Sequence, residues 1–356
     1  MDECQEEIGE RAKSPSPPHL RRREVVEIEK SGIVVKNKIL ERNFIDKGIK
    51  RGIKGFILKF RLGIILLGLV IVSSQLSPVF LTRENLFNIL KQSSITGCLA
   101  LGQTLIILTA GIDLSVGSMI ALSSVLSASY QTMGWLEAAY IGIVPCILLG
   151  WINGFMIDRG KIPPFIATLG MMGIIRGIAL TWTQGYTVVG IRDVFRFIGG
   201  GNIGVVPVPV VIWMSVFVFT FLLLETTKYG YAIRAVGGNE KAAFMCGINL
   251  TEVRLLVYSI SGFCAGLGGI IYTGRVATGQ PTAGVGLELD SIAAAVIGGT
   301  SLFGGTGGLF GTLVGVIILG ALGNLMNLVG ISPFVQYGVR GAIVLAAVYI
   351  NIRTRR

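Results

Sequence analysis

The chain has 356 residues, of which 52% are hydrophobic and only 14% are charged, and its mean hydropathy is +0.71. Soluble domains carry about 25% charged residues, so this composition excludes an ordinary water-soluble protein and indicates an integral membrane protein. The net charge of +11 does not indicate nucleic-acid binding, because the basic residues flank apolar runs instead of forming one face. The cysteines form no C-x-x-C pair and there is a single histidine, so we expect no metal site and no cofactor.

Residues 1–59 are predicted to form a basic, largely disordered leader in the cytosol. Residues 1–61 hold 15 of the 31 Lys and Arg residues and 10 of the 20 Asp and Glu residues. The segment 14–24 combines proline with clustered charge. The apolar region starts too far from the first residue for a signal peptide. A regulatory tail and an incidental extension both remain open.

Residues 60–351 alternate apolar runs with short polar connections, which predicts the transmembrane domain of an all-α membrane protein. A helix of about 20 apolar residues crosses a hydrocarbon core of about 30 Å. Residues 352–356 are expected to form a basic C-terminal tail. We expect about ten transmembrane helices, at 62–77, 86–109, 115–133, 136–157, 165–183, 208–224, 255–273, 285–301, 308–328 and 333–350.

The distribution of lysine and arginine predicts that both termini are cytoplasmic. Five basic residues lie between positions 50 and 61, directly before the first span. If that side is cytosolic, ten crossings place nine basic residues of the later loops and C-terminus inside and four outside. This bias satisfies the positive-inside rule, which an odd number of spans would break.

Ten spans also divide into two sets of five, separated by the 184–207 loop. An odd-numbered half that is repeated once must be inverted in the membrane, as in many transporters. GIDLSVG at 111–117 lies between the second and third spans, and GLELDSI at 286–292 lies between the seventh and eighth. We therefore predict a 5+5 inverted repeat with an acidic, glycine-containing break in each half.

Several polar residues in or beside the spans allow two interpretations. A carboxylate at the membrane centre costs about 2.5–3.5 kcal/mol, so Asp113 could mark a pathway. It could also cap the next span, with Ser115 as the second capping candidate. Amide side chains in the spans either line a path or bond neighbouring helices. The translocation-path candidates are Gln103, Asp113, Ser115, Asn153, Asn324 and Asn327.

Charged residues elsewhere in the spans are ambiguous in the same way. We favour a structural role over transport for Glu288 and Asp290. Arg176 and Arg340 either pair with backbone carbonyls or contact substrate hydroxyls.

Glycine spacing indicates close helix crossings. The G-x-x-x-G pairs at 173–177, 262–266, 307–311 and 311–315 belong either within the subunit or at a dimer seam. The related segment GGTGGLFG at 304–311 lacks the lysine and hydroxyl of a phosphate-binding loop, so its glycines are expected to form a tight turn. No phosphate-binding loop of this type occurs in the chain, and we expect the chain to be non-catalytic.

The longest inner loop, residues 225–254, contains the pattern of a short capped helix. Asn239 is a favourable N-cap, Glu240 suits the positive end of a helix, and Gly247 is placed just after the C-terminus. A helix of one or two turns is marginal alone in water, so it needs packing or a partner.

This segment, GNEKAAFMCGIN, resembles the E-A-A-x3-G cytoplasmic loop of ABC importer permeases, with Glu240, Ala242, Ala243 and Gly247 at the matching positions. Three longer blocks resemble the ribose-type, monosaccharide branch of the branched-chain amino acid/sugar permease superfamily. They are LTAGIDLSVGSMIAL (108–122), PFIATLGMMGIIRGIAL (164–180) and QPTAGVGLELDSIAAAVIGGTSLFGGTGGLFGTLVG (280–315). The resemblance covers residues 62–351.

The resemblance implies the membrane subunit of an ATP-driven importer for ribose or a related monosaccharide in the bacterial cytoplasmic (inner) membrane. It implies ABC ATPase subunits, an extracytoplasmic sugar-binding protein and a second permease subunit as partners. Residues 239–247 would form the helix that couples the ATPase to the membrane domain. Another pentose or hexose, an inositol or a furanosyl signal is the alternative solute, and an ion-coupled secondary transporter is the alternative class.

Overall fold

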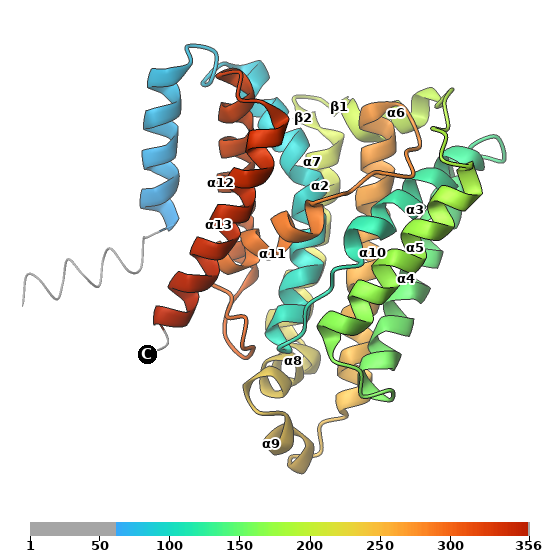
Figure 1. Cartoon of the computed structure of the whole chain (residues 1–356), viewed down its shortest axis with the longest axis vertical. Helices are drawn as coiled ribbons and strands as arrows, with labels where there is room; N and C mark the ends of the chain where they lie inside the picture. Colours follow the sequence, from blue (N-terminus) through green and yellow to red (C-terminus); the bar gives the residue numbers. More distant parts are fainter. Residues whose placement is uncertain (1–61, 355–356) are drawn as a thin grey trace, which may run out of the picture. The chain divides into compact units, whose positions relative to one another are not determined.

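The computed structural model describes residues 62–354, and nearly all of the regular secondary structure in this range is helical. The leader expected at 1–59 and the last residues of the C-terminal tail lie outside the described residues. Each of the ten expected apolar segments is helical (Figure 1). Their bounds are Leu62–Leu76, α2 Arg83–Leu108, α3 Val116–Ser129, α4 Trp135–Asp158, α5 Pro164–Thr183, α7 Val208–Thr226, α10 Leu250–Val276, α11 Leu287–Ile297, α12 Leu309–Leu328 and α13 Pro333–Thr354.

Within the described range, five helices are long and apolar enough to cross a membrane: α4, α5, α7, α10 and α12. The helix Leu62–Leu76 and α3 are apolar but shorter. Large apolar side chains stand exposed on the outer helices, such as Leu148 of α4, Ile174 of α5 and Phe219 of α7. Lipid is the solvent that suits such a surface. The number of crossings and the sides of the termini stay predictions.

Helix α10 lies at the centre of the packing and contacts α2, α3, α4 and α6, while α11 packs between α12, α2 and α13. Two of the glycine pairs make these crossings possible. A side chain at Gly262 would overlap with the Cys146 carbonyl of α4, and one at Gly315 would overlap with the Ala294 carbonyl of α11. Gly173 and Gly177 have no described atom near the position of an added Cβ. This pair therefore faces away from the rest of the described chain.

Helices α3 and α11 are shorter than the spans expected at 115–133 and 285–301. For α11 the reason is local: Gly286, with φ 85°, precedes its first turn, and Gly299, with φ 95°, follows its end. The non-helical segment that precedes α11 meets the first turn of α3, because a side chain at Gly284 would overlap with the Gly117 carbonyl. The two acidic breaks thus lie against each other, while the 5+5 repeat remains a prediction.

The loops contain structure that the apolar pattern does not predict. The 184–207 loop holds α6 (Asp193–Gly200) and a hairpin of β1 (Asn202–Ile203) and β2 (Val206–Pro207), paired antiparallel. The 225–254 loop holds α8 (Lys228–Gly238) as well as α9 (Glu240–Met245). In Figure 1 these two loop structures lie at opposite ends of the helices.

Candidate functional site

Helix α9 is the short capped helix that the sequence predicts. The Asn239 side-chain oxygen accepts a hydrogen bond from the Ala242 N–H at 3.0 Å. Gly247 has φ 81°, and its N–H donates to the Phe244 carbonyl at 2.9 Å. A left-handed residue just after a helix is the position that favours glycine. Both predicted caps of this helix are therefore confirmed, while its role in coupling is a separate question.

One face of α9 is buried against the protein and the other is open. Ala243 is 4% exposed, whereas Phe244 and Met245 are 68% and 88% exposed. No part of the chain that the structure describes covers these two adjacent large apolar side chains. Such a surface is typical of a protein–protein contact.

A shared arginine ties α9 to two long helices. Arg254, in the first turns of α10, lies 2.9 Å from the Asp158 carboxylate at the end of α4 and 2.7 Å from the Glu240 carboxylate at the start of α9. Thr251 donates to the second Asp158 oxygen at 2.6 Å. The side chains of Arg254 and Asp158 are 13% and 5% exposed, so water screens this pair weakly. Arg254 therefore joins the start of α9 to both α4 and α10.

Helix α8 provides the other side of the attachment. Thr227 caps it by accepting from the Tyr229 N–H at 3.2 Å. The Tyr229 hydroxyl donates to Glu252 at 2.8 Å, and this hydrogen bond raises the pKa of Tyr229. Arg234 of α8 pairs with Glu225 at the end of α7. Contacts at both ends of α8 thus connect it to α7 and α10.

The glycine-rich loop at 304–308 packs where α8 ends. A side chain at Gly237 would overlap with the Leu108 carbonyl, the last of α2, and the Gly305 N–H donates to that same carbonyl at 3.0 Å. Gly304 and Gly305 have φ 81° and 75°. The expected tight turn with close backbone contacts is confirmed. Through these contacts the end of α8, which directly precedes α9, packs against the end of α2 and the segment before α12.

Four of the six path candidates form one buried network at the break before α3. The Asp113 Oδ1 atom accepts from the Ser115 N–H at 2.8 Å and from its hydroxyl at 2.6 Å, and the Asn153 amide donates to that hydroxyl at 2.9 Å. With its amide in the favourable orientation, the Gln103 nitrogen donates to the Asp113 backbone carbonyl at 3.2 Å, and the Gln103 oxygen accepts from the Asp113 backbone N–H at 3.1 Å. Ser115, not Asp113, is the N-cap residue of α3.

The other two path candidates bond neighbouring helices. Asn324 of α12 exchanges two hydrogen bonds with Asn85 of α2, at 2.9 and 2.8 Å. The Asn327 oxygen accepts from the Gln336 amide of α13 at 2.8 Å. These contacts match the structural interpretation of the amides. Substrate contact by any of the six residues stays a prediction.

The arginines inside the spans both have partners. Arg176 donates through Nη1 to the Pro281 and Ala283 carbonyls, at 2.8 and 2.7 Å, and so holds the segment before α11. Arg340 of α13 pairs with Asp290 of α11 at 2.9 Å. The Arg176 contact is the carbonyl pairing that the sequence allows.

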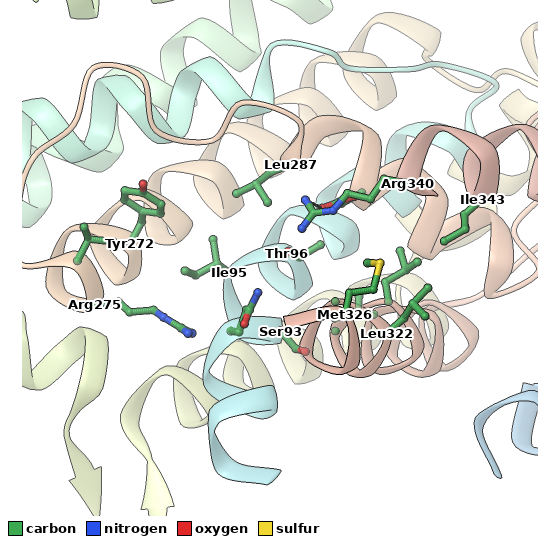
Figure 2. A pocket seen from close by; sticks show the side chains of 17 residues that line it. Ser93, Ile95, Thr96, Tyr272, Arg275, Leu287, Leu322, Met326, Arg340 and Ile343 are labelled. Carbon is green, nitrogen blue, oxygen red and sulfur yellow. Dashed lines mark hydrogen bonds and ion pairs between the residues drawn. The ribbon is translucent and has the colours of Figure 1, made fainter. Parts of the chain in front are cut away.

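A cavity of about 250 Å³ lies between α2, α10, α11, α12 and α13 (Figure 2). The Asp290–Arg340 pair lines it, together with polar side chains from two other helices: Gln92, Ser93 and Thr96 of α2, and Tyr272 and Arg275 of α10. None of the six path candidates lines this cavity. Sequence reasoning missed it because its wall is assembled from five separate helices, and no local spacing reveals that.

Apolar helices long enough to cross a membrane, an internal cavity with polar side chains in its wall and a short capped helix at one end of the bundle are consistent with a membrane transport protein. The family model described as "Branched-chain amino acid transport system / permease component" matches residues 85–348, and the chain belongs to this family. It is a permease subunit of the cytoplasmic membrane.

Curated relatives cover most of the chain. The ribose import permease of Bacillus subtilis (strain 168) is 45% identical over 287 residues, 80% of this chain and 89% of the relative. The ribose import permease of Escherichia coli (strain K12) is 42% identical over 306 residues, 84% and 95% of the two chains. The D-allose transport system permease of that strain is 38% identical, covering 80% and 88%. No solved structure matches the chain.

Proposed function

We propose that this chain forms the path by which ribose, or a closely related monosaccharide, enters the cell, driven by ATP hydrolysis on a partner. The chain is the membrane subunit of an ABC sugar importer, as the ribose and D-allose permeases among its relatives support. Ribose is favoured over D-allose because the ribose permeases have the higher identities, 45% and 42% against 38%. Other monosaccharides are the alternative.

The observation that carries the coupling mechanism is α9 itself. Its caps fix a rigid helix, and Phe244 and Met245 project from it, 68% and 88% exposed. We assign this exposed face to the ATPase subunit, with residues Asn239, Glu240, Ala242, Ala243 and Gly247 forming and holding the coupling helix. Burial of two large apolar side chains contributes roughly 1.5–3 kcal/mol each to such a contact.

Two contacts carry the movement of α9 into the membrane domain. Arg254 connects Glu240 to Asp158 of α4, and Gly237, at the end of α8, lies against the Leu108 carbonyl of α2. Both helices end near the break before α3. ATP binding and release on the partner would therefore bias two arrangements of packed helices, one open to each side.

The proposed orientation places α9 and both termini in the cytosol, with ten crossings between them. The opposite end then faces the sugar-binding protein. There the 184–207 loop, which contains α6 and the β1–β2 hairpin, presents exposed apolar side chains, among them Tyr186, Val189 and Val205, which are 76%, 71% and 64% exposed. A second copy of the chain would cover the open glycine face of α5, where Gly173 and Gly177 have no described neighbour.

The proposal is tested by co-purifying the permease with its ATPase subunits and reconstituting them in liposomes with the binding protein. Radiolabelled ribose should accumulate only when ATP is present on the side of the ATPase. Allose and arabinose serve as competing sugars. Uptake that persists without ATP, driven by an ion gradient, would favour a secondary transporter and overturn the proposal.

A further inference from the structure

The cavity between α2, α10, α11, α12 and α13 contains buried polar atoms that find no partner within the described chain. Ser93 is 2% exposed, and its hydroxyl has no hydrogen-bond partner. The Nη1 atom of Arg275 is also buried without a partner. Both side chains line the cavity (Figure 2). Neither atom faces the open space directly, but buried polar atoms are nearly always hydrogen-bonded, and a rotation of either side chain toward the cavity would give it a partner there.

The remaining polar wall combines donors and acceptors. Asp290, held by Arg340 at 2.9 Å, supplies carboxylate oxygens, while Gln92 and Thr96 add an amide and a hydroxyl. A sugar hydroxyl both donates and accepts, so it can bond to an arginine and to a carboxylate in the same site. This mixture suits a neutral, hydroxyl-rich molecule.

The same cavity has an apolar wall. Leu287 of α11, Ile95 of α2 and Met326 of α12 line it, and so does Tyr272, whose hydroxyl is occupied by Gln280 at 2.9 Å. Carbon-bound hydrogens of a sugar ring need such a surface, because ligand sites combine an apolar lining with a few placed polar groups. In Figure 2 the polar Ser93 and Arg275 lie on the same side of the cavity.

The space is sufficient for a monosaccharide. At about 30 Å³ per water molecule, 250 Å³ corresponds to about eight waters. Gly323 of α12 lines the cavity and is buried, yet an added Cβ would meet no atom within 4 Å. The Cβ direction of this residue therefore points into the open space.

The cavity lies at the opposite end of α10 from α9 and beside the first turn of α11. Tyr272 and Arg275 lie in the last turns of α10, while α9 precedes the first turn, so the 27-residue helix separates them by about 30 Å or more. Leu287 and Asp290 belong to the first turn of the short α11. Transporters form substrate sites beside such discontinuous helices.

We propose that this cavity is a monosaccharide-binding site inside the permease, where Ser93, Arg275 and Asp290 bond to the sugar hydroxyls after its release from the binding protein. The inference rests on the proposed function and adds a substrate site to it.

Filling the cavity tests the assignment in the reconstituted complex. Gly323→Leu should abolish ATP-driven ribose uptake, because the open Cβ direction of this residue sends the leucine side chain into the cavity. Gly68→Leu is the matched control, since Gly68 lies exposed in Leu62–Leu76 and an added Cβ meets nothing within 4 Å. It should transport normally. Equal uptake by both variants would overturn the cavity assignment, whereas absence of uptake in the unmodified complex would instead reject the proposed function.

A binding measurement keeps the proposal testable if Gly323→Leu is unstable. Thr96→Cys is introduced into the permease–ATPase complex with Cys4 and the exposed Cys246 replaced by serine. D-ribose should slow its reaction with a small thiol reagent, and Ser93→Ala or Arg275→Gln should raise the half-protecting concentration about tenfold, the effect of losing one hydrogen bond. Asp193→Cys, on exposed α6, should react at a rate independent of ribose. Failure of ribose to protect Thr96→Cys, or protection by inorganic phosphate instead, would contradict the site.

Discussion

The Glu240 carboxylate lies 2.7 Å from the Arg254 guanidinium, so the first residue of α9 is held by a side chain of α10. The same guanidinium contacts Asp158 of α4 at 2.9 Å. A six-residue helix has little stability of its own, and this pairing fixes it relative to two membrane helices. Helix α9 is thereby fixed to α4 and α10.

Arg254→Ala should impair both stability and transport. Removing one partner of a buried ion pair costs about 3–5 kcal/mol, and the half-exposed Glu240 contributes less than the buried Asp158. We expect a lower thermal midpoint in detergent and loss of ATP-driven uptake. Glu240→Gln, which breaks only the outer contact, should keep the midpoint near that of the unmodified protein but lower the uptake. Equal midpoints for Arg254→Ala and the unmodified chain would show that the pairing is unimportant.

Gly247→Val should weaken α9 without affecting the membrane helices. Gly247 has φ 81°, a conformation that costs other residues about 1–2 kcal/mol. Uptake and co-purification of the ATPase should both decrease, while the amount of permease in the membrane stays constant. Gly238→Val is a suitable comparison, because Gly238 precedes α9, has no positive φ and has no described atom within 4 Å of an added Cβ. Loss of the same size in both variants would mean that the turn at Gly247 is not the cause.

Substitutions at Gly262 and Gly173, which both belong to G-x-x-x-G pairs, should have different effects on folding and on pairing of the subunits. Gly262→Val places a side chain on the Cys146 carbonyl, so we expect failure of α10 to pack on α4 and a loss of folded protein. Gly173→Val meets no described atom and should yield folded subunits that no longer pair. Membrane expression and chemical cross-linking between copies measure the two effects. Normal pairing of Gly173→Val would remove α5 from the proposed dimer seam.

Asp113 variants separate a structural role from proton transfer. Asp113→Asn retains an oxygen that can accept from the Ser115 N–H, whereas Asp113→Ala removes the acceptor for two hydrogen bonds. We expect near-normal uptake for the Asn variant and a destabilisation of about 1–3 kcal/mol for the Ala variant, measured by thermal unfolding. If Asp113→Asn folds normally but does not transport, the carboxylate itself is required.

The sequence predicts much of the fold because apolar segments and caps are local patterns. The ten helices and both caps of α9, at Asn239 and Gly247, follow from them. The contact between Arg254 and Asp158 does not, because it joins residues 96 positions apart and depends on how α4 and α10 pack. The cavity could not be predicted for the same reason, because the residues in its wall come from five helices that are far apart in the sequence. The role of Asp113 could not be predicted, because an aspartate beside a span has the same sequence context whether it caps a turn or lines a path.

The most direct test of the coupling mechanism is photo-cross-linking in the intact importer. A benzophenone amino acid replaces Met245, which is 88% exposed on α9, or Tyr186, which is 76% exposed in the 184–207 loop. The Met245 probe should cross-link to the ATPase subunit, and the Tyr186 probe should not. Cross-linking of the Met245 probe to the sugar-binding protein, or of the Tyr186 probe to the ATPase, would contradict the account.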